Sequence, residues 1–105
     1  MYEFNYQKPS SVADAVSALQ AADDGKVMAG GMTLIPTLKL RLASPSDVID
    51  LGRVSDLGGI NASGDAVSIG AMTTHATVAS SSDIPALAAL ADGIGDAQVR
   101  NRGTI

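Results

Sequence analysis

Two adjacent glycines, Gly30 and Gly31, stand between a short apolar run and an amphipathic pattern that is typical of a helix. The apolar run, residues 27–29, predicts a buried strand, and Thr33 is expected to cap the following helix. A strand that turns through glycine into a helix presents successive backbone N–H groups and the positive end of the helix dipole. A bulky anion can approach such a turn closely because glycine has no side chain. The segment therefore predicts a diphosphate cradle, to which the Thr33 hydroxyl would add a donor.

The glycine pair also has a purely structural interpretation, an ordinary strand-to-helix turn that binds nothing. The segment matches neither the Rossmann pattern G-x-G-x-x-G nor the Gly-Lys-Ser/Thr of a P-loop. Spacing by itself favours the structural interpretation over the diphosphate cradle, so both stay open at this point.

Few other side chains could do chemistry. His75 is the single histidine, a residue type that can act as a general base, but a packed or surface histidine is the favoured interpretation. Asp92 and Asp96 are like charges four residues apart and form no paired-carboxylate site. Four basic side chains could contact an anion but are expected on solvated surfaces: Lys39, Arg41, Arg100 and Arg102. The sequence therefore assigns no catalytic residue and no metal ligand.

The composition excludes several classes of protein. The 105 residues include 7 Lys and Arg against 11 Asp and Glu, one His and no Cys. Without cysteine the chain holds no disulfide, thiol nucleophile, zinc finger or iron–sulfur cluster of its own. The acidic balance argues against nucleic-acid binding, and no apolar run approaches the roughly 20 residues of a membrane span. The first ten residues are polar and mixed rather than a secretory signal, so a cytoplasmic location is expected.

Apolar periodicity predicts an α/β chain with a small βαβ unit. Helices are predicted over residues 11–20, 34–42, 75–81 and 85–90. Strands are predicted over residues 26–29, 47–51, 57–62 and 66–71. Ser11 with Asp14 resembles a capping box, Leu42 shares the apolar face of the second helix, and Leu90 stands at core spacing in the last. No stop signal is visible at the end of the chain, where Gly103 to Ile105 look like the middle of a turn.

Taken together, these segments resemble a known family, the FAD-binding medium subunits of molybdenum hydroxylases. That group includes the medium subunits of carbon monoxide dehydrogenases and of xanthine dehydrogenase-like enzymes. The resemblance covers essentially all of the chain, in order and with matching spacing. The matching pieces are Phe4-x-Tyr6-x-x-Pro9-Ser10-Ser11, Ala29 to Pro36 with Leu38 to Arg41, Val48 to Leu51, Ile69 to His75, and Ile94 to Ile105.

The resemblance implies an FAD-binding domain of the vanillyl-alcohol-oxidase (PCMH) type, with residues 1–55 as its first subdomain and 56–105 as the start of its second. It implies that the residues wrapping the FAD pyrophosphate through backbone N–H groups are Ala29, Gly30, Gly31, Met32 and Thr33, flanked by Met28 and Leu34. It implies that the residues near the flavin are Ala71, Ile94, Gly95 and Val99. Gly103, Thr104 and Ile105 would begin a second FAD loop, so this chain alone would hold half of the family's site.

The resemblance further implies a role in electron transfer within a complex. A small subunit with [2Fe–2S] clusters would deliver electrons, a large subunit would carry the molybdenum cofactor, and NAD, a quinone or oxygen would accept electrons from FAD. Two alternatives come from other classes of protein. One is a non-catalytic α/β interaction module that binds no flavin, and the other is a stand-alone FAD oxidase in which His75 alone could carry a covalent link.

Overall fold

The computed structural model describes residues 1–105, which divide into two units, Met1–Ser55 and Asp56–Ile105. The first unit is built on three parallel strands, β1 (Asn5–Gln7), β2 (Gly25–Met28) and β3 (Asp47–Asp50), in the order β1-β3-β2. Because all three strands are parallel, their carboxyl ends meet at one edge of the sheet, the usual place for a ligand in an open α/β sheet.

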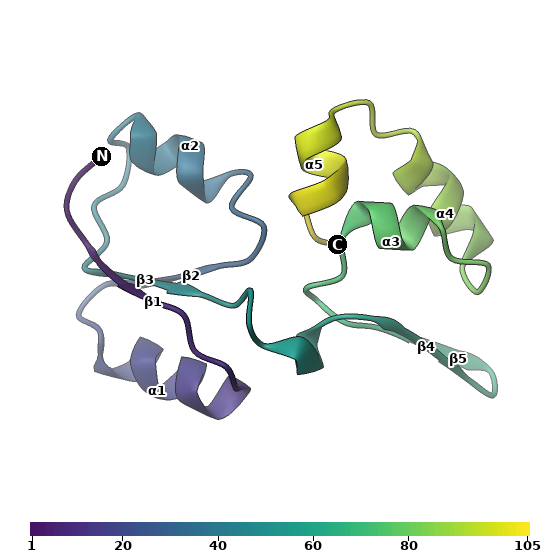
Figure 1. The fold of residues 1–105 in the computed structure, drawn as a ribbon, viewed down its shortest axis with the longest axis horizontal. Helices are drawn as coiled ribbons and strands as arrows, with labels where there is room; N and C mark the ends of the chain where they lie inside the picture. Colours follow the sequence, from purple (N-terminus) through teal and green to yellow (C-terminus); the bar gives the residue numbers. More distant parts are fainter. The chain divides into compact units, whose positions relative to one another are not determined.

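Two helices cover the sheet of the first unit on opposite faces (Figure 1). They are α1 (Val12–Ala21) and α2 (Leu34–Lys39). Every residue of β3 is buried, and Val48 and Ile49 form the centre of the core. The connection β2–α2–β3 is the parallel βαβ unit that the periodicity predicts.

The second unit combines a hairpin with three short helices. After a 3-10 turn at Ser55–Leu57, strands β4 (Ile60–Ser63) and β5 (Ala66–Ile69) pair antiparallel. The helices are α3 (His75–Ala79), α4 (Pro85–Asp92) and α5 (Ala97–Arg102). Val78 of α3 and two alanines of α4 supply its buried apolar side chains. No helix of the structure has the length and the apolar character that a membrane crossing requires.

Several local predictions are confirmed. The Ser11 hydroxyl accepts a hydrogen bond from the Asp14 N–H at 3.1 Å, as the capping pattern predicts. The predicted hairpin and the helices after His75 and Pro85 are present. The strands on either side of α2 also lie within one residue of their predicted limits, but β2 is not the predicted buried strand, since none of its residues is buried and Val27 is 45% exposed.

The second helix ends earlier than predicted, at Lys39 rather than near residue 42. Arg41 adopts a left-handed conformation, with φ of 57°, where helices ordinarily end in glycine. The Arg41 N–H then donates to the Leu38 carbonyl at 3.1 Å and the Leu42 N–H to the Thr37 carbonyl at 3.0 Å, which closes the helix. Leu42 is consequently 73% exposed, so its predicted place on the buried face is wrong.

Other predictions are corrected by the structure. Thr33 is not a side-chain cap, because its backbone is helical and its hydroxyl makes no capping hydrogen bond. Leu90, predicted at core spacing, is 74% exposed, and α4 instead buries Ala88 and Ala91. The strand predicted from residue 57 begins only at Ile60, since residues 55–57 form the 3-10 turn. Strand β1 and helix α5 are additional elements that the periodicity does not predict.

Candidate functional site

The loop between β2 and α2 carries a run of free backbone donors at the carboxyl edge of the sheet. The N–H groups from Ala29 to Leu34 donate no hydrogen bond to any other group of the chain. The loop is nonetheless fixed at its far side, because the Gly31 carbonyl accepts from the Ile35 N–H at 3.0 Å. A fixed run of unpaired N–H groups followed by a helix start is the arrangement that binds phosphate. The loop therefore fits a diphosphate group.

Gly31 is the residue in this loop whose backbone requires glycine. Its φ is 77°, and it is buried. A Cβ atom added there would lie 2.6 Å from Cδ1 of Ile35 and 3.3 Å from the sulfur of Met28. Close packing and the left-handed backbone therefore both exclude a side chain, and the loop keeps its backbone near the sheet.

A cluster of polar side chains stands at the same edge of the sheet. The Asp50 carboxylate accepts hydrogen bonds from the Tyr6 hydroxyl at 2.5 Å and the Gly52 N–H at 2.8 Å. The Lys8 ammonium lies 3.5 Å from the same carboxylate. Sequence reasoning gave these residues no role, because Tyr6 and Asp50 are 44 positions apart and meet only when β1 pairs with β3.

The surroundings of this cluster shift two pKa values in opposite directions. Burial would raise the pKa of Asp50, but the hydrogen bonds from Tyr6 and Gly52, with the charge of Lys8, bring it below its usual value. The hydrogen bond to Asp50 raises the pKa of the Tyr6 hydroxyl, since the protonated phenol is the donor. A hydrogen bond from Ser46 likewise lowers the pKa of Asp47, at the amino end of β3.

These shifts predict how the stability of the protein depends on pH. A lowered carboxyl pKa stabilises the fold above the unfolded value near 4 and loses this effect as pH falls below it. A raised tyrosine pKa stabilises the fold below about pH 10 and loses this effect above it. We expect the free energy of unfolding in urea, followed by circular dichroism, to fall at both extremes. In Asp50→Asn both declines should be smaller, and unchanged declines would contradict this assignment.

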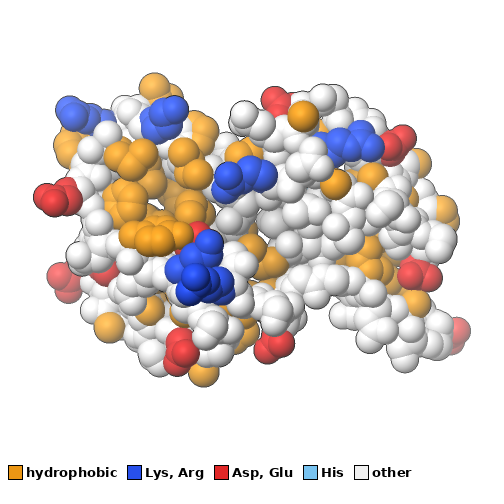
Figure 2. All heavy atoms as spheres, viewed as in Figure 1, with side chains coloured by type: hydrophobic (Ala, Val, Ile, Leu, Met, Phe, Trp, Pro, Cys, Tyr) orange, Lys and Arg blue, Asp and Glu red, His pale blue; other side chains and the backbone are white.

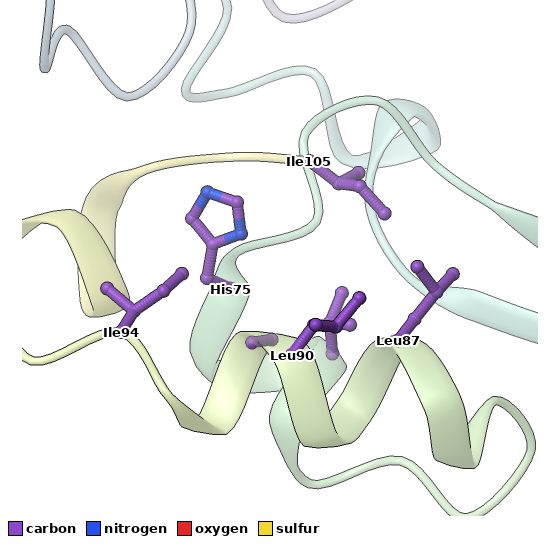
Figure 3. Close-up of a pocket in the computed structure, with 7 residues that line it drawn as sticks. His75, Leu87, Leu90, Ile94 and Ile105 are labelled. Atoms are coloured by element: carbon purple, nitrogen blue, oxygen red, sulfur yellow. The ribbon is translucent and has the colours of Figure 1, made fainter.

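In the second unit, an apolar groove of about 220 Å³ brings together Ile94, which is predicted to lie near the flavin, and Ile105, which is predicted to belong to the second FAD loop (Figure 3). His75 is its one side chain with a titratable group. The remaining lining residues are Val78, Leu87, Leu90 and Ala91. The exposed Leu87 and Leu90 thus face a hollow rather than the core, which explains why Leu90 does not have the predicted burial.

The other predicted residues of the second unit lie around α5 and the turn after β5. The Gly103 N–H donates to the Val99 carbonyl at 2.8 Å, and the Gly103 carbonyl accepts from the His75 N–H at 3.0 Å. Thr104 pairs with Thr74 in an isolated bridge. Ala71 follows the hairpin, and Gly95 stands in open space between α4 and α5. The structure thus brings the last three residues of the chain to the start of α3.

The predicted site residues fall into the two units. Residues 28–34 belong to the first unit, and Ala71 with residues 94–105 belong to the second. Figure 2 shows apolar side chains gathered on the visible face of the first unit, between α2 and the sheet, with lysine and arginine side chains around them. The Arg41 guanidinium stacks 5.3 Å from the centre of the Tyr2 ring, which links the first residues of the chain to the end of α2.

Comparison with known proteins identifies the family. Residues 2–105 match the model of the FAD binding domain in molybdopterin dehydrogenase. The chain is 47% identical to the carbon monoxide dehydrogenase medium chain of Hydrogenophaga pseudoflava and 43% identical to the nicotine 6-hydroxylase medium subunit of Paenarthrobacter nicotinovorans. These alignments cover 97% and 95% of this chain and 37% of each relative. The chain thus spans little more than a third of the length of these relatives.

Solved structures agree with this fold. The structure matches carbon monoxide dehydrogenase from Hydrogenophaga pseudoflava with a TM-score of 0.90 at 46% identity. It matches quinoline 2-oxidoreductase from Pseudomonas putida 86 with a TM-score of 0.91 at 35% identity. Both matches cover 97% of this chain and 37% of the other. From its sequence and its fold alike, the chain belongs to the family of FAD-binding domains of molybdopterin dehydrogenases, as the resemblance implies.

Proposed function

We propose that this chain is part of the flavin subunit of a molybdenum hydroxylase and that it binds the diphosphate of FAD on the loop from Met28 to Leu34. The observation that carries this proposal is the run of unpaired N–H groups from Ala29 to Leu34. Because the chain belongs to an FAD-binding family, the anion expected at these N–H groups is the diphosphate of FAD. Met32 and Thr33 would contribute through their backbones, whereas the Thr33 hydroxyl is also free to donate.

The second unit would contribute contacts to the flavin end of the cofactor. The proposed contact residues are Ala71, Ile94, Gly95, Val99, Gly103, Thr104 and Ile105. Support comes from the apolar groove, which Ile94 and Ile105 line together. An apolar surface excludes water from a planar ring system and stabilises it by burial.

The bound FAD would supply the redox chemistry by accepting electrons and passing them on, whereas the residues of this chain bind and orient it. The proposed electron donor is a partner subunit with [2Fe–2S] clusters, beside a large subunit that holds the molybdenum cofactor. The external acceptor would be NAD, a quinone or oxygen, and the complex would act in the cytoplasm. Support comes from relatives named as medium subunits or chains of dehydrogenases and hydroxylases. No side chain of this chain has to act as a general acid or base in such a role.

A titration with two flavins tests the proposal. FAD carries the diphosphate, whereas riboflavin has the same ring system without it. If the loop binds the diphosphate, the protein should bind FAD at least about tenfold more tightly than riboflavin, a difference of about 1.4 kcal/mol. The quenching of flavin fluorescence gives both dissociation constants, and ADP should compete with FAD.

Two results would count against the proposal. Equal affinities for FAD and riboflavin would show that the protein does not recognise the diphosphate. The absence of any flavin binding would favour a non-catalytic interaction module, in which the glycine pair serves only as a turn.

A further inference from the structure

The central strand β3 carries a buried carboxylate at each end, Asp47 at the amino end and Asp50 at the carboxyl end. Both residues are 8% exposed. A buried charge is costly unless it is paired, and a well-packed apolar residue often stabilises a fold as well or better. The charge at the carboxyl end therefore calls for an explanation beyond packing, because that end faces the proposed ligand.

Asp50 contacts two segments at this end of the sheet, β1 with the residue after it and the turn after β3. Its carboxylate accepts hydrogen bonds from the Tyr6 hydroxyl of β1 and from the Gly52 N–H in the turn after β3. It also pairs with the ammonium of Lys8, the residue after β1. Each carboxylate oxygen has at least one partner. The contacts with Tyr6 and Lys8 fix the carboxyl end of β3 against β1, and the contact with Gly52 fixes the turn that follows β3.

On the other side, the same end of β3 holds the start of the loop. Met28 lies opposite Asp50 in the register of β2 and β3, and its carbonyl accepts the Leu51 N–H at 2.9 Å. Met28 is the last residue of β2, so the free N–H run begins with the next residue. Whatever fixes Asp50 and Leu51 therefore also fixes the point from which the loop leaves the sheet.

We propose that Asp50 is a positioning residue for the diphosphate-binding loop, holding its entry at Met28 through the clamp with Tyr6, Lys8 and Gly52. This inference rests on the proposed function. The ammonium of Lys8 has a second effect, because it offsets the negative charge of Asp50 at an edge where an anion is to bind. The clamp thus supplies rigidity without adding an uncompensated charge of the wrong sign.

The strand itself offers a matched control. Asp47 has the same burial as Asp50 and accepts hydrogen bonds from Gln7 and Ser46, but it lies at the opposite end of β3. The variants Asp50→Asn and Asp47→Asn both remove one carboxylate charge from the same buried strand. The experiment measures FAD affinity by fluorescence and the unfolding temperature of each variant, with the titrations run well below both unfolding temperatures.

We expect Asp50→Asn to weaken FAD binding at least about tenfold and Asp47→Asn to change it less than about twofold, at comparable losses of stability. Equal effects of the two variants on affinity would overturn the positioning role. If the unchanged protein binds FAD no better than riboflavin, the proposed function itself fails. If it discriminates between the two flavins and Asp50→Asn does not weaken FAD binding, only the positioning role fails.

A pH profile separates positioning from a general loss of structure. The charged and titratable groups that face Asp50 and Tyr6 are Lys8 and Arg53. In Tyr6→Phe, the carboxylate loses its phenol donor while Lys8 and Gly52 remain, so the pKa of Asp50 should rise. FAD affinity in this variant should then decline at a higher pH on the acid side than in the unchanged protein. If FAD affinity declined at the same acid pH in both proteins, the inference would be contradicted.

Discussion

We expect the Gly30→Val variant to bind FAD about 100-fold more weakly than the unchanged protein, or not at all. Gly30 lies within the run of unpaired N–H groups, where a diphosphate would need to approach the backbone closely. A branched side chain at this position would stand between the N–H groups and the anion. Such a loss corresponds to about 2.7 kcal/mol of binding free energy, and titration with FAD under quenching of flavin fluorescence measures it.

The position of Gly30 makes this variant a cleaner test than a change at Gly31. Gly31 has a positive φ and closely packed neighbours, so any side chain there strains the fold itself, whereas Gly30 is not among the residues with positive φ. Gly30→Ala should show a smaller loss of affinity than Gly30→Val, because the effect follows the size of the side chain. Ala21→Val adds a valine at the end of α1, on the opposite face of the sheet from α2, and should leave the affinity unchanged (Figure 1).

Two results would remove the loop from the FAD site. Undiminished FAD affinity in Gly30→Val is the first. The second is a loss of affinity that only accompanies a large fall in unfolding temperature, since it would reflect the fold rather than the site.

The sequence predicts those elements whose signals are local. The Ser11 cap, each strand and helix of the βαβ unit and the glycine loop follow from residues near one another in the sequence, and the structure contains all of them. The end of α2 has no such signal, because Arg41 occupies the left-handed position in which glycine would have marked the stop. The predicted helix accordingly runs too far.

Features that depend on contacts between residues far apart in the sequence cannot be predicted from local sequence patterns. Strand β1 has three residues and exists because β3 pairs with it, so its own sequence is too short to show a period. The contact between Tyr6 and Asp50 depends on the same pairing. The exposure of Leu90 depends on the groove beside α4 rather than on helical spacing. The candidate loop could therefore be predicted from the sequence, and the clamp that holds its entry could not.

Gly70→Ala should lower the stability of the second unit by about 2–3 kcal/mol, a typical cost of overpacking. A Cβ atom at Gly70 would lie 2.3 Å from the Leu57 carbonyl oxygen and 2.7 Å from its carbon. This oxygen cannot simply move away, because it accepts the Met72 N–H at 2.7 Å, while the Gly70 N–H donates to the Gly59 carbonyl at 2.8 Å. Urea unfolding followed by circular dichroism measures the loss.

Gly95→Ala is the matched control for this stability measurement, because nothing lies within 4 Å of a Cβ atom at Gly95. Its stability should stay within about 0.5 kcal/mol of the unchanged protein. Equal stabilities of the two variants would mean that the backbone at residues 57–59 yields easily. A loss of stability in Gly70→Ala alone would instead show that the backbone is rigid where Gly70 packs against residues 57 and 58. This rigid contact would then fix Ala71, which follows Gly70. It would also fix Ile105 beside the apolar groove, because the Thr73 carbonyl accepts the Ile105 N–H at 3.0 Å.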